Sequence, residues 1–430
     1  MKSSPRSMSV NPLQLSKDIL SSTTALVDHL SSIDRPSPSF DPSSCLPPDT
    51  SEYEALRVAI NNSALDLLRL VNGPAISFRT QFCTHYDLAA YQVALEFDFF
   101  THVPLDGSIS TVDLAQKARI DEDKVSRTMN FMATQRVFHQ ITVGDDSEAW
   151  EHTLASAVLA RDSNLRDASL MQLDEMFRAA SETSTIVRDH PFKGDSIHSP
   201  FHAKHGLTAY EYYSKYPLKG GRFARAMAGV TALDRQTSEL HDEYPWGSHK
   251  GGPIVDVGGG SGHISVSLAL KFPHLNFIVQ DVSPIMLAQG EALLTPEVKG
   301  RITFMQHDFF TPQPVAHAGA FLVRQITHNW NDEECIKLLQ NLIPALEKSV
   351  PGTPLLINDT VLPDLGEKMA YEEYGLRQLD IAMFVVLGAK QRSEKEFRTL
   401  LKQADRRFKL VKIHSKGSMG LLEVHLEVTK

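Results

Sequence analysis

Residues 253–262 read Pro-Ile-Val-Asp-Val-Gly-Gly-Gly-Ser-Gly and form the most informative stretch of the chain. The run from Ile254 to Val257 is short, apolar and rich in β-branched residues, which predicts a buried strand. The glycines after it allow a tight turn and a close approach of a ligand to the backbone. Because a largely apolar helical segment follows from Ser261, the N–H groups at the start of a helix can face a polar ligand at this turn.

The order of these glycines differs from the Gly-x-Gly-x-x-Gly pattern of phosphate-binding dinucleotide sites. Here the turn reads Gly258-Gly259-Gly260-Ser261-Gly262, and Asp256 stands two residues before the first glycine. A carboxylate in that place would repel a pyrophosphate, but it suits a ligand with a cationic end. The sequence therefore favours a nucleotide-like ligand that carries a positive charge.

Length and charge exclude several classes of protein. A chain of 430 residues is long enough for two domains, each with its own core. Its net charge of −9 argues against a basic surface for nucleic acid or for an anionic membrane. No apolar run approaches the roughly 20 residues that span a bilayer. Without an apolar signal core at the start, and with three cysteines far apart, we expect a reduced, cytoplasmic setting.

The predicted secondary structure of the chain changes at Gly251. Before it, apolar periodicity predicts helices over residues 12–30, 53–71 and about 86–97, and residues 31–52 form a Ser/Pro-rich arm. After it, strands and helices alternate, which predicts an α/β fold with a mostly parallel, doubly wound sheet. The late pair of strands suits an antiparallel hairpin at the sheet edge. The expected strands are 254–257, 277–280, 302–306, 320–324, 354–359, 408–414 and 421–428, with helices over 332–349 and 393–404 among them.

Residues 108–142 have the pattern of a winged helix. Thr111 can cap a helix over 112–118, Asp121 can cap a second helix that runs to Thr134, and residues 136–142 predict a strand. In a DNA-binding protein the second helix should carry base and phosphate contacts. Its charge is mixed here and the whole chain is acidic, so we interpret the winged helix as structural.

Acidic and aromatic residues stand where two of the predicted strands end. Asp281 ends the second strand of the sheet, where a carboxylate can accept hydrogen bonds from both hydroxyls of a ribose. Asp308 and Phe309 end the third strand and offer an acceptor for an adenine amino group and an aromatic face for its ring. In α/β sheets ligands bind outside the carboxyl ends of the strands, so these residues predict one adenosine site.

The same residues carry a family resemblance over nearly the whole chain. The sequence resembles the plant caffeate-type and fungal S-adenosyl-methionine-dependent O-methyltransferases. By that resemblance, Gly258, Gly259 and Gly260 border the methionine part of the cofactor, and Arg324 occupies the position of a basic residue that lies along it. Asp281 then binds the ribose, and Asp308 and Phe309 hold the adenine. The motifs are Val255–Gly262, Gln280-Asp281, His307-Asp308-Phe309 and Leu-Val-Arg-Gln-Ile-Thr-His-Asn-Trp over 322–330.

The resemblance also implies an active site. His328 is similar to the family's general base, which removes a phenol proton while the oxygen attacks the sulfonium methyl. Two acidic residues orient this histidine in the family. Asp359 matches the first, where the plant enzymes carry Glu. Gln391 matches the second and is not acidic, so it can hydrogen-bond the imidazole but cannot stabilise an imidazolium by charge.

The resemblance implies further contacts to the acceptor. Phe223 and Met227 match positions that sandwich a flat acceptor, although a helix face in the core explains them equally well. His139 belongs to a region that approaches the acceptor pocket in relatives. His198, His202 and His205 lie in a segment broken by Pro and Gly, so we expect no metal there.

The implied organisation has three parts and a homodimer. We expect an N-terminal helix and arm over 1–52, a helical and winged-helix dimerisation and substrate domain over 53–245, and a Rossmann-like catalytic domain over 246–430.

Three classes of function are compatible with the sequence, and they are not equally well supported. The leading hypothesis is an O-methyltransferase for a phenolic or enolic small molecule of secondary, polyketide-type metabolism. A second class is a pericyclase that binds S-adenosyl-methionine without methyl transfer and dehydrates or cyclises a polyketide-derived intermediate. Arg324, His139, Gln391 and Asn329 keep that alternative open. A third class, a regulatory protein built on the winged helix, is disfavoured by the acidic charge and by the intact set of cofactor residues.

Overall fold

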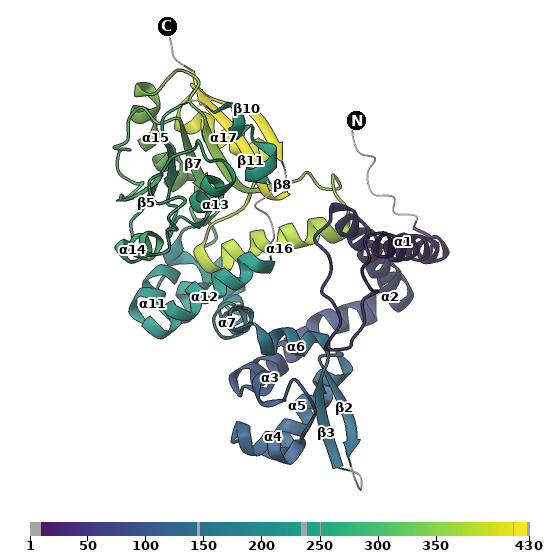
Figure 1. Ribbon diagram of the computed structural model, residues 1–430. Helices are drawn as coiled ribbons and strands as arrows, with labels where there is room; N and C mark the ends of the chain where they lie inside the picture. Colours follow the sequence, from purple (N-terminus) through teal and green to yellow (C-terminus); the bar gives the residue numbers. More distant parts are fainter. Residues whose placement is uncertain (1–9, 144–146, 234–238, 250, 416, 428–430) are drawn as a thin grey trace. The chain divides into compact units, whose positions relative to one another are not determined.

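The computed structural model describes residues 10–143, 147–233, 239–249, 251–415 and 417–427 (Figure 1). The chain forms two compact units. We call them the helical unit (Met1–Ser181, Tyr210–Asp234 and Met369–Glu372) and the sheet unit (Glu182–Ala209, Arg235–Lys368 and Glu373–Lys430). The domain boundaries expected after residues 52 and 245 stay predictions.

The sheet unit contains an eight-stranded sheet with a parallel core. Its strand order is β10-β11-β8-β7-β4-β5-β6, and β9 pairs with β8 beside this path. The antiparallel hairpin of β10 and β11 lies at one edge and joins β8, which confirms the predicted architecture; Val428, expected at the end of the last strand, lies outside the described residues. The strands are Ile254–Val257 (β4), Phe277–Asp281 (β5), Ile302–Gln306 (β6), Ala320–Arg324 (β7), Leu355–Leu362 (β8), Arg392–Ser393 (β9), Phe408–Ser415 (β10) and Gly417–Leu426 (β11).

Side chains of the central strands alternate between two apolar cores. Val255 and Val257 of β4 belong to a core that includes residues of α15 and α17. Ile254 faces the other way and packs with residues of α13. A sheet with helices on both faces buries its central strands on both sides, which explains the mostly apolar sequences of β4 and β7. The helices of this unit are Thr183–Asp189 (α9), Pro200–His205 (α10), His263–Lys271 (α13), Pro284–Ala292 (α14), Asp332–Lys348 (α15), most of Ala370–Leu387 (α16) and Glu394–Ala404 (α17), with short helical turns Ser196–His198 (η2), Glu239–Glu243 (η3), Trp246–Ser248 (η4) and Thr327–Asn329 (η5).

The helical unit begins with two long helices, Pro12–Ser32 (α1) and Ser51–Glu96 (α2). The predicted separate helices over 53–71 and 86–97 are wrong in one respect, because α2 runs on through the residues between them. Gly73 has φ +67 and kinks the helix, and Pro74 then starts the second half, where its missing N–H does no harm. The other helices of this unit are Phe99–His102 (α3), Thr111–Ala118 (α4), Glu122–Thr134 (α5), Leu154–Arg161 (α6), Ser163–Met171 (α7), Gln172–Met176 (η1), Phe177–Ala180 (α8), Ala209–Lys215 (α11) and Pro217–Leu233 (α12).

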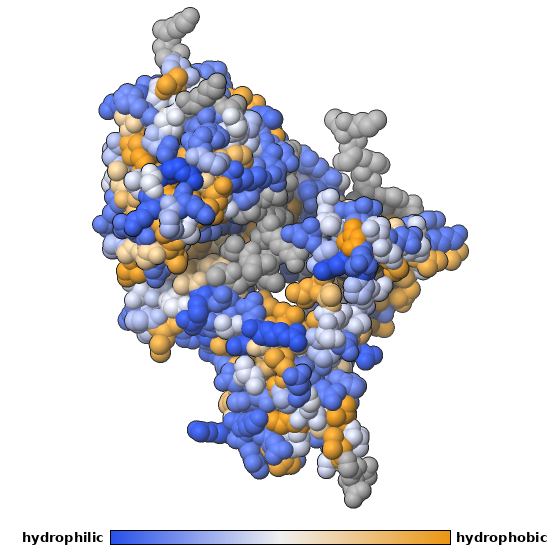
Figure 2. All heavy atoms as spheres, in the orientation of Figure 1, coloured by the Kyte–Doolittle hydropathy of each residue, from blue (hydrophilic) through white to orange (hydrophobic). Residues whose placement is uncertain are grey.

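Large apolar side chains of α2 are exposed on both sides of this kink. Figure 2 shows apolar side chains gathered over the region of α1 and α2, at the right of the view. The rings of Phe78 and Phe82 stack on each other at 5.7 Å, one turn apart. An exposed apolar stripe of this length is typical of an interface. The exposed residues on α2 are Leu68, Leu70, Val71, Ile76, Phe78, Phe82 and Tyr86.

The winged helix is present in the helical unit. Asp121 caps α5 as predicted, but the cap of α4 is Ser110 rather than Thr111, since the Ser110 hydroxyl accepts from the N–H of Asp113 at 3.0 Å. The predicted strand is β2 (Phe138–Val143), and it pairs with β3 (Ser147–His152) in a sheet completed by β1 (Ile109–Ser110). The polar segment of β3 did not predict a strand. Trp150 holds it, because this buried indole donates to Thr111 Oγ1 at 3.0 Å.

Among the described residues, no helix is both long and apolar enough to cross a membrane. The expected compartment stays a prediction.

Candidate active site

The glycine turn after β4 has the conformation that only glycine adopts readily. Gly258, Gly260 and Gly262 have φ values of +72, +58 and +73. At Gly259 the constraint is space, because an added Cβ would lie 2.5 Å from the Cγ of Asp256. These constraints explain why glycine stands at these positions, and the predicted contact with a ligand stays a prediction.

Asp256 supports the turn from below. Its side chain is buried beneath Gly259 and accepts a hydrogen bond from Ser265 Oγ of α13 at 2.7 Å. Burial raises the pKa of Asp256 to about 6, although the hydrogen bond from Ser265 and the charge of Arg324 oppose the shift. This carboxyl group thus fastens the strand to the helix across the turn.

Asp281 closes the other side of the turn, at the end of β5. One carboxylate oxygen accepts from the N–H of Gly260 at 3.0 Å, and the other accepts from the N–H of Ser283 at 2.8 Å. A carboxylate has about four acceptor positions, so two bonds leave capacity for the hydroxyls of a ribose. Asp281 is therefore both a structural clasp and a suitable ligand group.

Asp308 and Phe309 lie just beyond the end of β6. The exposed Asp308 accepts from the N–H of Phe310 at 2.9 Å. The ring of Phe309 meets Trp330 edge to face at 6.0 Å, and its Cε1 lies 3.4 Å from a Cβ built on Gly258. The structure thus brings Phe309 beside the glycine turn.

Arg324 ends β7, the neighbour of β4. It donates to Asn358 Oδ1 on β8. Its charge acts on the glycine turn, because it opposes the rise that burial causes in the pKa of Asp256 and, after burial, contributes to the lowered pKa of His263 at the start of α13. The sequence analysis did not single out Asn358. Its place beside Asp359, as two adjacent polar residues within a strand that is otherwise largely apolar, is the signal that could have found it.

His328 lies in the short helical turn η5 and is held by Asp359 of β8. Its Nδ1 is 2.5 Å from Asp359 Oδ1, and its backbone N–H donates to Asp359 Oδ2 at 3.1 Å. Thr327 Oγ1, which sequence reasoning missed, donates to the same oxygen at 2.6 Å. Burial raises the pKa of Asp359, but the imidazole and these hydrogen bonds outweigh burial and hold it below its usual value. Within the described part of the chain, no hydrogen bond engages His328 Nε2.

Gln391 does not join this pair. Its backbone N–H donates to Asp380 Oδ1 at 2.8 Å. Both polar atoms of its side chain are buried, and neither has a hydrogen-bond partner among the described residues. The structure therefore brings Asp359, and not Gln391, into hydrogen-bond contact with His328.

Phe223 and Met227 lie on α12 in the helical unit. The ring of Phe223 stacks on Tyr213 at 4.3 Å and 24°, and both α12 residues pack against Ala168 and Met171. These contacts account for their partial burial within the unit. Their predicted role toward an acceptor stays a prediction.

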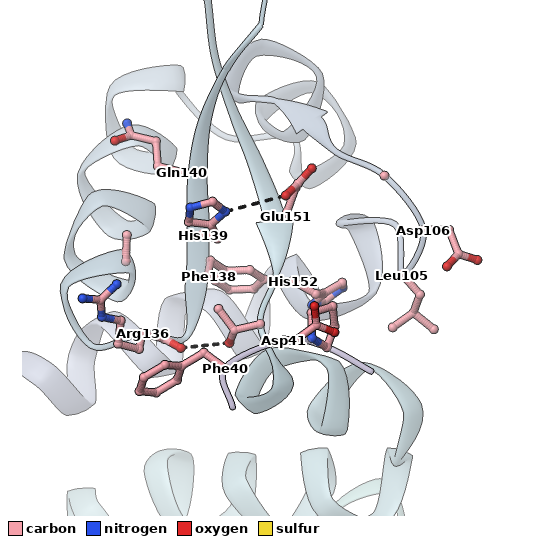
Figure 3. A pocket seen from close by; sticks show the side chains of 14 residues that line it. Phe40, Asp41, Leu105, Asp106, Arg136, Phe138, His139, Gln140, Glu151 and His152 are labelled. Atoms are coloured by element: carbon pink, nitrogen blue, oxygen red, sulfur yellow. Dashed lines mark hydrogen bonds and ion pairs between the residues drawn. The ribbon is translucent and has the colours of Figure 1, made fainter. Parts of the chain in front are cut away.

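His139 is exposed on β2 and borders a cavity of about 840 Å³ in the helical unit (Figure 3). The cavity lies between the winged helix and the arm at Phe40 and Asp41. His139 Nδ1 is 3.6 Å from Glu151 Oε2, the pair joined by a dashed line in Figure 3. The lining of this cavity includes none of the predicted cofactor residues. Among the described residues, no three His, Cys, Asp or Glu side chains converge as metal ligands would.

Comparison with known proteins agrees with this geometry. The O-methyltransferase domain family matches residues 187–407. O-methyltransferase sol2 of Alternaria solani is 48% identical over 424 residues, which cover 99% of this chain and 97% of sol2. Two solved structures share the fold: OxaC, with a TM-score of 0.75 at 22% identity over 97% of this chain and 99% of OxaC, and a structure described as a pericyclic reaction enzyme, with a TM-score of 0.71 at 19% identity over 95% and 99%. The chain belongs to the O-methyltransferase family and is an S-adenosyl-methionine-dependent O-methyltransferase.

Proposed function

We propose that His328 is the general base that deprotonates a phenolic or enolic hydroxyl group during methyl transfer. The observation that carries this proposal is the pairing of His328 Nδ1 with the buried Asp359 carboxylate at 2.5 Å. An ionised Asp359 holds the proton on Nδ1, so Nε2 is the acceptor of the neutral imidazole. When Nε2 takes a proton, the same carboxylate stabilises the imidazolium.

The residues around the glycine turn fit S-adenosyl-methionine. A Cβ would lie 2.7 Å from Ile326 Cδ1 at Gly258 and 2.5 Å from Asp256 Cγ at Gly259, so the turn has no side chain at these positions, and Asp281 retains acceptor capacity next to Gly260. Asp281 would take the ribose hydroxyls, while Asp308 and Phe309 would meet the adenine. Arg324, together with Gly258, Gly259 and Gly260, would border the methionine part. When bound, the cofactor supplies the methyl group on a sulfonium centre and leaves as the neutral sulfide.

The chemistry of the base limits the acceptor. A neutral imidazole can take a proton from a phenol, whose pKa is near 10, while the oxygen attacks. An aliphatic alcohol is a much weaker acid, so the same base generates less negative charge on its oxygen for attack on the methyl group. A small phenol or enol is therefore the best-supported acceptor. Phe223 and Met227 would supply flat apolar contacts to it, and His139 would supply a polar one.

A homodimer fits the surface of the helical unit. The apolar side chains exposed along α2, among them Phe78 and Phe82, form a stripe that a second copy of the same stripe would cover. The chain carries a net charge of −9, so close association of two copies requires apolar contact rather than charge attraction. Sedimentation of the full chain should show a dimer, and a Phe78→Glu/Phe82→Glu variant should sediment as a monomer.

Product analysis tests the proposed reaction. The purified full chain is incubated with methyl-labelled S-adenosyl-methionine and a panel of phenolic and enolic polyketides. We expect label in the product and one S-adenosyl-homocysteine formed per turnover. Turnover without S-adenosyl-homocysteine, unaffected by His328→Asn, would instead support the pericyclase reaction. The structural argument for that reaction is the Gln391 amide, which has no hydrogen-bond partner among the described residues.

A further inference from the structure

A second buried charge faces the His328 turn. Arg392 is only 1% exposed, and it stands on β9, which pairs in parallel with β8 at Val361. β8 also carries Asp359. Two short stretches of neighbouring strands therefore direct one buried anion and one buried cation at residues 327–332.

The guanidinium of Arg392 spans both ends of the turn. Nη1 donates to the carbonyl oxygen of Thr327 at 2.6 Å, and Nη2 donates to that of Trp330 at 2.9 Å. Nε and Nη2 also donate to Asp332 Oδ1, at 2.9 and 2.8 Å. The two carbonyl groups lie immediately before and two residues after His328, so the planar fork fixes the backbone on each side of the base.

The two buried charges have complementary tasks. Asp359 accepts from the donors of the turn, which are Thr327 Oγ1, the N–H of His328 and its ring. Arg392 donates to the acceptors of the turn, which are the carbonyls of Thr327 and Trp330. The thiol of Cys335, a weak donor, also reaches these two carbonyls, at 3.3 and 3.6 Å.

The charge of Arg392 is balanced at the same place. A lone guanidinium near His328 would oppose protonation of the imidazole. Asp332 offsets it, because burial raises the pKa of Asp332 but hydrogen bonds and charge from Arg392 and Lys390 outweigh this and lower it. Lys390 reaches Asp332 at 3.0 Å. The charge of Arg392 is therefore compensated where it stands, and the role that we infer for it is geometric.

We propose that Arg392 is the positioning residue of the general base, holding residues 327–330 so that His328 keeps its bond to Asp359. This inference rests on the proposed role of His328. The family resemblance assigns an orienting role to Gln391. We assign that role to the neighbouring Arg392, because its side chain bonds the turn at Thr327, whereas the Gln391 amide has no hydrogen-bond partner among the described residues.

The test compares two neutralising substitutions on either side of Gln391. Arg392→Gln removes the fork, whereas Lys390→Gln removes a cation from the same Asp332 and leaves the carbonyls of the turn bonded. Cofactor-binding sites are counted by calorimetry with S-adenosyl-homocysteine, and kcat and KM are expressed per binding site. We expect Arg392→Gln to lower kcat about 10- to 100-fold, with cofactor Kd and acceptor KM within about threefold. Lys390→Gln should stay within about twofold of the parent, and Arg392→Lys should recover part of the lost kcat.

Each outcome separates the two claims. If the activity lost in Arg392→Gln is fully explained by fewer binding sites, or if Arg392→Lys recovers stability but no kcat, the residue is merely structural and the inference is overturned. Should His328→Asn abolish methyl transfer while Arg392→Gln keeps full kcat per site, only the positioning role fails. If His328→Asn itself keeps full kcat, the proposed base is wrong.

Discussion

The glycine turn at 258–262 and the base turn at 327–330 are built by opposite means. Backbone conformation shapes the first, with three positive φ values and no room for a Cβ at Gly259. Side chains from distant strands shape the second, since Asp359 and Arg392 hold a turn that is 32 and 65 residues away from them along the chain. We therefore expect the glycine turn to be most sensitive to an added side-chain atom, and the base turn to be most sensitive to the loss of a hydrogen bond.

The largest expected effect comes from a substitution that disrupts the base turn at 327–330. Asp359→Asn keeps the size of the side chain but removes its charge and presents an amide to His328, which disturbs both the tautomer and the imidazolium. We expect kcat to fall about 10²- to 10⁴-fold while cofactor Kd changes less than about threefold. Steady-state kinetics and calorimetry measure the two quantities. Asn358 is the neighbour for comparison, because Asn358→Asp should alter the Arg324 contact and therefore cofactor binding. If Asp359→Asn lowers kcat and cofactor affinity by the same factor, the two turns do not have separate roles in catalysis and cofactor binding.

The next largest effect is expected from a substitution that disrupts the glycine turn at 258–262. Gly259→Ala places a Cβ 2.5 Å from Asp256 Cγ, and Asp256 cannot retreat because it is buried and bonded to Ser265. We expect cofactor Kd to rise at least about 10-fold by the strain of overpacking, with kcat at saturating cofactor within a few-fold. Gly300→Ala is the matched control, since nothing lies within 4 Å of a Cβ there. Unchanged cofactor Kd in Gly259→Ala would show that the turn is not the cofactor site.

A smaller effect concerns pH and Asp256. The pKa of this carboxyl is about 6 in the folded chain, against about 3.9 in an unfolded one. Its folded pKa is raised, so the folded state loses stability as pH rises from about 4 to about 6, by an amount of order 1–3 kcal/mol, and the loss persists above pH 6. Asp256→Asn removes this dependence. Relative to the parent protein, the variant should gain Tm at pH 8 and gain little at pH 4.5. A gain in Tm that is the same at both pH values would contradict the assignment.

The smallest effect concerns Gln391. Its amide is buried without a partner among the described residues, so Gln391→Leu removes a desolvation penalty of about 1–3 kcal/mol and should raise the free energy of unfolding. Gln313→Leu should do the reverse, because the buried Gln313 and Gln280 exchange hydrogen bonds at 2.9 and 2.8 Å. Chemical denaturation measures both. If Gln391→Leu destabilises the fold or raises acceptor KM about 10-fold, its amide has a partner in the working enzyme.

The fold was predictable wherever local pattern and burial agree. Each strand of the parallel core is a short apolar run next to turn residues, and the glycine turn follows from the identity of its residues. Two of the elements that the sequence did not predict, β3 and β9, show the physical reasons. β3 is mostly polar and its buried residues Ala149, Trp150 and His152 do not alternate with exposed ones, and β9 has only two residues, whose pairing with β8 no local pattern reveals.

The site was predictable in part. Positions at strand ends pointed to Asp281 and Phe309, and the family resemblance pointed to His328 and Asp359. Arg392 could not be found in this way, because its partners are two backbone carbonyls and an aspartate 60 or more residues away, and carbonyl groups leave no trace in a sequence.

The central claim is that His328 removes the acceptor proton while the glycine turn only binds the cofactor. Single-turnover methyl transfer by His328→Asn, with labelled cofactor and acceptor both saturating, tests it most directly. We predict a rate about 10²- to 10⁴-fold below that of the parent protein, with an unchanged Kd for S-adenosyl-homocysteine. A rate within about threefold of the parent would contradict the account.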